Sequence, residues 1–186
     1  MATYPKDDLI TAEEFAEMDF GDRKMELIDG IIYAMGGGSV SRARVQSNLM
    51  IALGSRLKGT GCRPFGSDMG VRTGDHSTLY PDVSVFCGKD SPDHDDEKFS
   101  SDPRIIFEVL SPSTKRRDQT DKLDKYRAIA SVEAIVLIDA DAETVRTYRR
   151  TGETAWQDEF FPRPDTVDLP SLDITLPAEE IFARWT

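Results

Sequence analysis

The spacing of apolar residues predicts one long helix in the first third of the chain. Five of them follow the spacing i, i+4, i+7, i+8 and i+12, namely Val45, Leu49, Ala52, Leu53 and Leu57. This spacing places all five on one face of a helix. We expect the helix to run over residues 40–58 and to end at Gly59, because glycine commonly terminates helices.

Short apolar runs bounded by turn residues predict a sheet. Residues 24–35 hold two such runs on either side of Asp29-Gly30, a strong signal for a β-hairpin. Residues 104–110 and 132–138 are nearly continuous apolar runs, which is typical of strands buried on both faces. Further strands are expected at 63–65, 69–72 and 80–86, and a second hairpin is expected at 145–149 and 154–160.

Three more helices complete the predicted order of elements. Thr11 and Glu14 have the spacing of a capping box and predict a helix over residues 11–18. Residues 115–130 and 177–185 are the other two expected helices. Helices alternating with strands in this way predict an α/β fold with a mixed central sheet. The 186 residues suit a single domain over residues 1–186.

Composition narrows the class of protein. Hydrophobic residues make up 39% and charged residues 31% of the chain, values that suit an ordinary globular domain. No apolar stretch approaches the roughly 20 residues that span a bilayer, so no membrane partner is expected. The first residues lack the basic and apolar blocks of a secretory signal, which makes the cytoplasm the expected compartment.

The two cysteines, Cys62 and Cys87, are too few for a disulfide framework to be expected. Cys87 ends an apolar run and is expected to be a small buried hydrophobe. A zinc site is not expected either, because the chain has no close pairs of cysteine and histidine at ligand spacing. Any metal ion is therefore expected to be bound through oxygen.

The net charge of −11 opposes tight, non-specific binding of DNA, because phosphates favour a basic surface. Part of the acid is concentrated in residues 89–98. Basic residues cluster at 115–117 and again at Arg146, Arg149 and Arg150. The net charge is a sum over the whole chain, whereas a groove that binds nucleic acid needs positive charge only locally. The net charge therefore does not exclude an enzyme that acts on nucleic acid.

Three positions are candidates for chemistry. Glu108 lies in an apolar strand, where a carboxylate is costly unless it is paired or binds a metal. Asp82 begins a strand after Pro81, where an aspartate that closes a turn is the alternative. Lys122 lies between Asp118 and Tyr126 at four-residue steps, along one stripe of the expected helix. For Glu108 the alternative is a glutamate at the strand end that pairs with an arginine or with a helix N-terminus. For Lys122 the alternative is an exposed acid–lysine pair on the helix.

Two strand carboxylates followed by a helical lysine are a combination suited to cleaving phosphodiesters. Carboxylate oxygens bind Mg²⁺ or Mn²⁺ while leaving water on the ion. The ion activates water and stabilises charge on the phosphate. A nearby lysine orients the water or steadies the phosphate oxygens.

A resemblance to a known family rests on these residues. Pro81-Asp82, the run FEVLSPST over residues 107–114, and the D-x3-K-x3-Y motif that begins at Asp118 resemble the Uma-type family. This family belongs to the PD-(D/E)xK superfamily of nucleases. The resemblance covers roughly residues 10–180. It implies a restriction endonuclease-like fold, with a mixed central β-sheet flanked by helices.

The resemblance also implies a function and its main residues. It implies a metal-dependent endonuclease that hydrolyses phosphodiester bonds in DNA by metal-activated water, with Mg²⁺ or Mn²⁺ as cofactor. Asp82 and Glu108 are the implied metal ligands. The superfamily usually places its lysine two residues after the second acid, which is Leu110 here, so Lys122 is the implied catalytic lysine.

Supporting residues follow from the same resemblance. Glu26 is the implied N-terminal acid that completes the catalytic site through a water, and Asp118 and Tyr126 are implied supports. Family members often carry a histidine at the start of the first long helix, where this chain has Arg42. Restriction-like nucleases commonly pair to cut both strands, so a homodimer is expected.

Two other functions are compatible with the residues. A non-catalytic nucleic-acid-binding or assembly module on the same fold agrees with the acidic charge, because a fold does not fix a function. A glycosidase also uses a pair of carboxylates. It has no use for Lys122 and needs an aromatic-lined cleft, whereas tyrosine and tryptophan are sparse here, so it ranks last.

Overall fold

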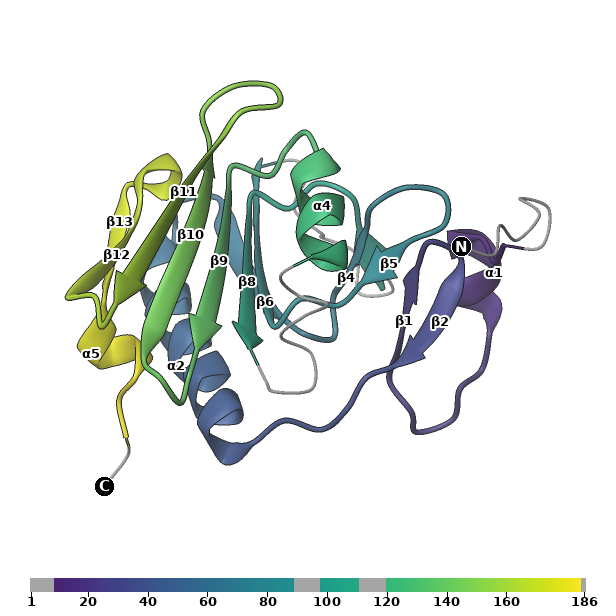
Figure 1. Ribbon diagram of the computed structural model, residues 1–186, viewed down its shortest axis with the longest axis horizontal. Helices are drawn as coiled ribbons and strands as arrows, with labels where there is room; N and C mark the ends of the chain where they lie inside the picture. Colours follow the sequence, from purple (N-terminus) through teal and green to yellow (C-terminus); the bar gives the residue numbers. More distant parts are fainter. Residues whose placement is uncertain (1–8, 89–97, 111–119, 185–186) are drawn as a thin grey trace.

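The computed structural model describes residues 9–88, 98–110 and 120–184 (Figure 1). The helices are α1 (Ala12–Glu17), α2 (Val40–Leu57), α4 (Asp121–Ala128), α5 (Ala178–Ile181) and the 3₁₀ turn η3 (Pro170–Leu172). The strands are β1 (Met25–Ile28), β2 (Ile31–Ala34), β3 (Cys62–Gly66), β4 (Gly70–Arg72), β5 (Thr78–Leu79), β6 (Val83–Cys87), β7 (Phe99–Ser100), β8 (Ile105–Leu110), β9 (Ala134–Asp139), β10 (Thr144–Arg150), β11 (Trp156–Pro162), β12 (Thr166–Leu169) and β13 (Ile174–Pro177).

A six-stranded sheet forms the centre of the fold, in the order β11-β10-β9-β8-β6-β3. Strands β8 and β9 are parallel, and the other neighbours are antiparallel. The two apolar runs predicted to be buried strands are β8 and β9, which pair with each other in the middle of the sheet. The predicted α/β fold with a mixed central sheet is therefore confirmed.

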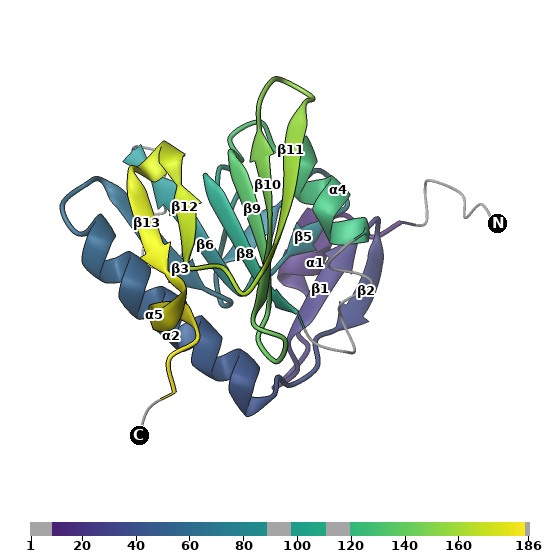
Figure 2. The same cartoon turned by 60° about the vertical axis from the view of Figure 1, so that its left-hand side comes forward.

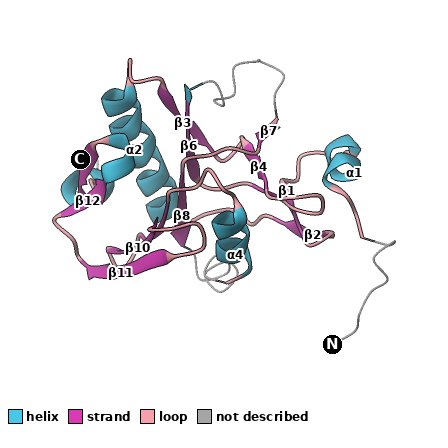
Figure 3. Ribbon diagram, turned by 90° about the horizontal axis from the view of Figure 1, so that it is seen from above, coloured by secondary structure: helices cyan, strands magenta, loops and turns pink. Residues whose placement is uncertain are grey.

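Helices α2 and α4 cover opposite faces of this sheet (Figure 3). The predicted apolar face of α2 is buried in one cluster with Phe107 and Val109 of β8. Leu123 and Tyr126 of α4 belong to a second cluster, with Ile106 of β8. The alternation of side chains along β8 explains this division, because successive residues point to opposite faces of a sheet.

A second sheet, in the order β2-β1-β5-β4-β7, carries the N-terminal hairpin. Asp29 and Gly30 both have positive φ, at 50° and 75°, as a two-residue type I′ hairpin turn requires. A Cβ atom on Gly30 would lie 2.6 Å from Cβ of Leu9, so this position also has no room for a side chain. The hairpin prediction is confirmed, whereas the two-residue strands β5 and β7 lie outside the predicted set.

Three helix predictions are confirmed at their cores. Thr11 and Glu14 form the capping box of α1, and α2 follows an N-cap at Ser39. Helix α4 begins at Asp121, and residues 115–119 of its predicted span lie outside the described residues. No helix in the described part of the chain is long and apolar enough to cross a membrane.

The C-terminal prediction is partly wrong. The final helix, expected over residues 177–185, is only the four-residue α5. It follows a hairpin, β12–β13, that the sequence reasoning missed and that lies with α5 on the α2 side of the sheet (Figure 2). The side-chain amide of Asn48 donates to the carbonyl oxygens of Ile181 and Ala183, each at 3.0 Å. These bonds satisfy the carbonyl groups where the helix ends.

The expectation that Cys87 is a small buried hydrophobe is wrong, because this residue is only half-buried and is disulfide-bonded. Cys62 of β3 and Cys87 of β6 are directly opposite in the antiparallel register, with their Cα atoms 4.0 Å apart, and they form a disulfide. Cys87 is therefore not a free buried thiol. Strand pairing brings together two cysteines that are 25 residues apart, a relation that cysteine spacing alone does not indicate.

Candidate active site

Asp82 and Glu108 lie at adjoining ends of two central strands. Val83 pairs with Phe107 in the antiparallel register of β6 and β8, and one further step sets Asp82 opposite Glu108. Residues that are opposite in this way present their side chains on the same side of the sheet. Asp82 is 2% exposed and Glu108 is 1% exposed. Because a buried carboxylate without partners is costly, both need charged or hydrogen-bonding neighbours.

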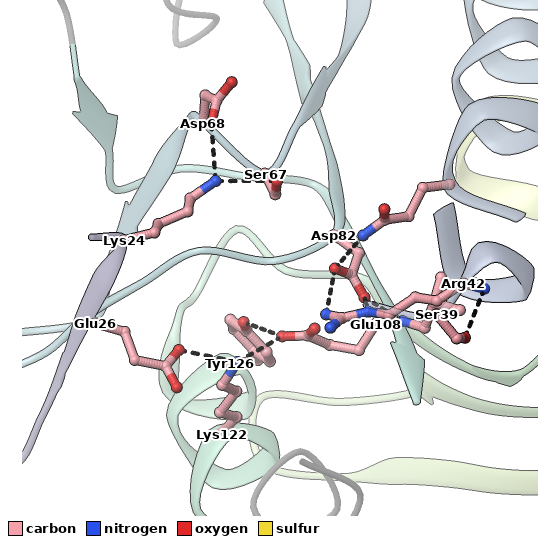
Figure 4. A network of polar contacts seen from close by, with 12 residues as sticks. Lys24, Glu26, Ser39, Arg42, Ser67, Asp68, Asp82, Glu108, Lys122 and Tyr126 are labelled. Atoms are coloured by element: carbon pink, nitrogen blue, oxygen red, sulfur yellow. Dashed lines mark hydrogen bonds and ion pairs between the residues drawn. The ribbon is translucent and has the colours of Figure 1, made fainter. Parts of the chain in front are cut away.

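Lys122 supplies such a neighbour for Glu108 (Figure 4). Its Nζ lies 3.5 Å from Oε1 of Glu108 and 2.9 Å from Oε2 of Glu26. Tyr126, one helical turn further along α4, donates its hydroxyl to the same Glu108 oxygen at 2.6 Å. Lys122 itself is 3% exposed. The lysine therefore joins the central sheet, helix α4 and strand β1 of the second sheet through buried ionic contacts.

Asp82 has a different set of partners, which come from α2 and β8. Its Oδ1 accepts hydrogen bonds from Nη2 of Arg42 at 2.6 Å and from Nε2 of Gln46. Its Oδ2 accepts from Nε of Arg42 at 3.3 Å and from the backbone N–H of Val109 at 2.6 Å. The guanidinium thus forms a two-point ion pair with a buried carboxylate.

The first turns of α2 explain how Arg42 and Gln46 reach Asp82. The two residues are four apart and therefore lie on one stripe of the helix. The hydroxyl of Ser39 caps the helix by accepting from the backbone N–H of Arg42 at 3.3 Å. Val45 and Leu49, close to this stripe, are fully buried against the sheet. Packing of α2 on the sheet therefore positions Arg42 next to Asp82, where β6 begins.

A cleft of about 480 Å³ leads from solvent to Asp82. Its lining residues are Asp22, Arg23, Lys24, Ala34, Met35, Gly36, Gly37, Gly38, Arg42, Ala43, Gln46, Ser67 and Asp82. A Cβ atom on Gly36 or Gly37 would meet no atom within 4 Å, so the glycine run leaves this wall of the cleft open. Lys24 is fixed at the rim by Ser67 and Asp68, at 3.0 and 2.8 Å from its Nζ.

Beside the site, burial raises the pKa of the Tyr80 phenol above its usual value. Lys24 lies over the ring of this tyrosine, with its Nζ 5.6 Å from the ring centroid. A raised pKa keeps the hydroxyl protonated and neutral at physiological pH. Tyr80 therefore contributes an apolar body and a neutral polar group next to Pro81 and Asp82.

Asp82 and Glu108 have the donor chemistry of a Mg²⁺ or Mn²⁺ site. Among residues 9–88, 98–110 and 120–184, no three histidine, cysteine, aspartate or glutamate side chains converge closely enough to bind one metal ion. Mg²⁺ is usually held by only one or two carboxylates and keeps several waters. Two hard oxygen ligands fit that requirement. One of them, Asp82, lines the cleft, and Arg42 engages both of its oxygens in this arrangement.

The structure brings five of the six predicted site residues into one place, namely Glu26, Asp82, Glu108, Lys122 and Tyr126 (Figure 4). The sixth, Asp118, lies outside the described residues. The alternative of an exposed lysine pair on α4 does not hold for Lys122, which is buried between two glutamates. The alternative of a simple turn for Asp82 does not hold either, because Arg42 binds its carboxylate.

Arg42 and Gln46 belong to the site, although no role is predicted for them from the sequence. A signal for them exists in the sequence, because both are polar residues close to the apolar face of the predicted helix. Arg42 is only 9% exposed, although arginine is rarely buried without a partner. The partner, Asp82, is 40 residues away in sequence, so the pattern of α2 alone does not identify it.

The basic cluster of β10 is engaged within the fold. Arg146 makes a two-point ion pair with Asp158, at 2.7 Å for each bond, and Arg149 pairs with Glu159. Arg150 donates to backbone carbonyl groups, including those of Val132 and Ile129, each at 2.7 Å. These arginines therefore stabilise the β10–β11 hairpin and its surroundings.

Two known proteins are similar to this chain in sequence over most of its length, and one crystal structure is similar to it in fold. Two are uncharacterized proteins of Synechocystis sp. (strain ATCC 27184 / PCC 6803 / Kazusa). One, slr1290, is 28% identical over 97% of this chain and 94% of its own length. The other, sll1609, is 29% identical over 80% of this chain and 85% of its own length. The third is a crystal structure described as "a putative nuclease belonging to DUF820" from Anabaena variabilis ATCC 29413. It has a TM-score of 0.77 and 27% identity, and the match covers 94% of this chain and 98% of that one.

The TM-score confirms the predicted nuclease-like α/β fold, and the match covers nearly all of both chains. A family model described as "Putative restriction endonuclease" matches residues 12–179, which include every residue of the site described above. Both results agree with the resemblance seen in the sequence motifs. The chain therefore belongs to the Uma2 family, which carries that description.

Proposed function

We propose that this protein is a Mg²⁺- or Mn²⁺-dependent endonuclease that hydrolyses phosphodiester bonds in DNA. The observation that carries the proposal is the convergence of Asp82, just before β6, with Glu108 of β8 and Lys122 of α4, where Asp82 lines the cleft. Membership of the Uma2 family and the nuclease description of the Anabaena protein support it.

Each side chain has a proposed role that follows from its contacts. Asp82 and Glu108 would hold the metal ion. The ion, when bound, activates water and neutralises charge at the scissile phosphate. The bond from Tyr126 orients the Glu108 carboxylate through Oε1. Lys122 places a positive charge beside Glu108, where it steadies the phosphate oxygens or the attacking water.

Glu26 and Asp118 complete the proposed site. Glu26 is a positioning residue, because its carboxylate binds Nζ of Lys122 at 2.9 Å and fixes the ammonium group near Glu108. Asp118 is proposed as a further support on the strength of the sequence motif. We also propose a single domain over residues 1–186 that acts in the cytoplasm as a homodimer, since two copies are needed to cut both strands together.

Incubation with supercoiled plasmid tests the proposal. We expect Mg²⁺ or Mn²⁺ to convert the plasmid to nicked or linear forms, and we expect a chelator to stop the conversion. The dependence on metal follows from the proposed role of the two carboxylates, which would hold the cation that activates water. Absence of cleavage with every metal, together with absence of any stabilisation by Mn²⁺, would contradict the proposal.

A non-catalytic nucleic-acid-binding or assembly module is the second candidate. The net charge of −11 favours the assembly module, because it opposes tight binding to nucleic acid. The two-point bond from Arg42 to Asp82 favours a non-catalytic role. Thermal unfolding with and without Mn²⁺ separates the two functions. When the free Mn²⁺ concentration is 100 times the Kd, binding raises the free energy of unfolding by about 2.7 kcal/mol. A module without a metal site is expected to show no change in the free energy of unfolding.

A further inference from the structure

The carboxylate of Asp82 is fully occupied by hydrogen-bond donors. Arg42 donates to both oxygens, Gln46 donates to Oδ1, and the backbone N–H of Val109 donates to Oδ2. An ionised carboxylate offers about four acceptor positions. A metal ion that binds Asp82 must therefore displace at least one of these donors.

Arg42 is the donor best placed to leave. The amide of Val109 is fixed within the central strand β8, whereas Arg42 and Gln46 are side chains that line the open cleft. The Arg42 side chain is 11% exposed and reaches Asp82 from the cleft wall. Its positive charge also opposes a second cation on the same carboxylate, which the neutral Gln46 does not.

The charges of the site point to what would draw Arg42 away. The three carboxylates and two cations leave one net negative charge. A divalent ion added to this set leaves one positive charge in excess, and a single phosphodiester restores neutrality. Of the two cations, Arg42 lines the cleft through which a phosphodiester would enter, and guanidinium groups bind phosphate through two parallel bonds.

We propose that Arg42 is an exchangeable cation that holds Asp82 until substrate arrives. The arginine moves from Asp82 to a phosphate of the nucleic acid, and the carboxylate then accepts the metal ion. Metal and nucleic acid consequently bind with positive coupling, which must be reciprocal. The inference rests on the proposed nuclease function and adds the order in which its site is assembled.

Mn²⁺ affinity, measured by electron paramagnetic resonance of the free ion, tests this exchange. Without nucleic acid, Arg42→Gln is expected to lower the Kd for Mn²⁺ by at least about tenfold relative to wild type, because the competing charge is gone. Arg23→Gln is the matched control, since it removes the same charge from an exposed residue of the same cleft. This control is expected to leave the Kd within about twofold of wild type.

Coupling is measured by adding a short DNA duplex at low temperature and checking on a gel that it stays intact. The duplex is expected to lower the Kd of wild type for Mn²⁺ several-fold and to have less effect on Arg42→Gln. If Arg42→Gln does not fold, Arg42→Lys decides, because it lacks the two-point bond and is expected to bind Mn²⁺ roughly threefold more tightly than wild type.

Equal Mn²⁺ affinities in wild type and the Arg42 variants would overturn the exchange. Such a result together with metal-dependent plasmid cleavage by wild type would leave the nuclease proposal intact. If no variant binds Mn²⁺ and wild type does not cleave plasmid, the proposed function itself fails, and the exchange fails with it.

Discussion

Lys122→Met is expected to lower the free energy of unfolding by about 3–5 kcal/mol, because it leaves two buried carboxylates without their shared cation. Glu26 and Glu108, 2% and 1% exposed, both contact Nζ of this lysine. Urea unfolding followed by circular dichroism measures the change. The same variant is expected to lose metal-dependent cleavage.

Lys125→Met is the control for this prediction. Lys125 lies three residues further along α4 and pairs with Asp29, whose side chain is 66% exposed. Exposed ion pairs of this kind contribute about 0–1 kcal/mol, so this variant should unfold almost as wild type does. Equal stabilities of the two variants would show that the buried contacts of Lys122 do not support the fold.

Reduction of the disulfide between Cys62 and Cys87 is expected to lower the free energy of unfolding by about 3.5 kcal/mol, the value for a loop of this length. The bond closes a loop over a sequence separation of 25 residues and joins the edge strand β3 to β6, the strand that leads back to Asp82. Guanidinium unfolding with and without a reductant measures the effect.

The double variant Cys62→Ser, Cys87→Ser is the control for the disulfide. It is expected to match the reduced wild type and to be insensitive to reductant. If oxidised and reduced wild type unfold at the same denaturant concentration, the bond does not stabilise the fold.

Elements with strong local signals were predictable from the sequence. Five apolar residues of α2 fall on one helical face, and all five are buried. The Asp29-Gly30 turn was predictable because only a few residue types accept positive φ at both positions. Strand β8 was predictable from six residues with only one polar side chain, Glu108, which also identified the site.

Elements that depend on distant partners were missed. Strands β5 and β7 have two residues each, too few for a periodic pattern. The β12–β13 hairpin turns through a 3₁₀ segment with Asp173 at a positive φ of 54°, and its sequence lacks a common hairpin dipeptide. These elements are fixed by pairing and packing, which a single sequence does not display.

In the candidate site, too, residues with a local sequence signal were predictable, whereas contacts between distant residues were not. The residue types around Glu108 and Lys122 identified the chemistry, because a buried acid and a helical lysine stand out locally. The link between Arg42 and Asp82 required α2 and β6 to meet across 40 residues of sequence. Asp118, the metal ion, the homodimer and the single domain over residues 1–186 stay predictions.

Plasmid cleavage by Asp82→Ala and Glu108→Ala, beside wild type at matched purity, decides whether these two carboxylates form a nuclease site. Asp158→Ala is the matched control. It also removes a carboxylate, but this carboxylate pairs with Arg146 of β10 and not with a residue of the site. We expect cleavage with Mg²⁺ or Mn²⁺ by wild type and control, and a loss of at least about a hundredfold in both site variants. Cleavage that survives in both site variants would come from another site or another protein, and it would contradict the assignment of Asp82 and Glu108.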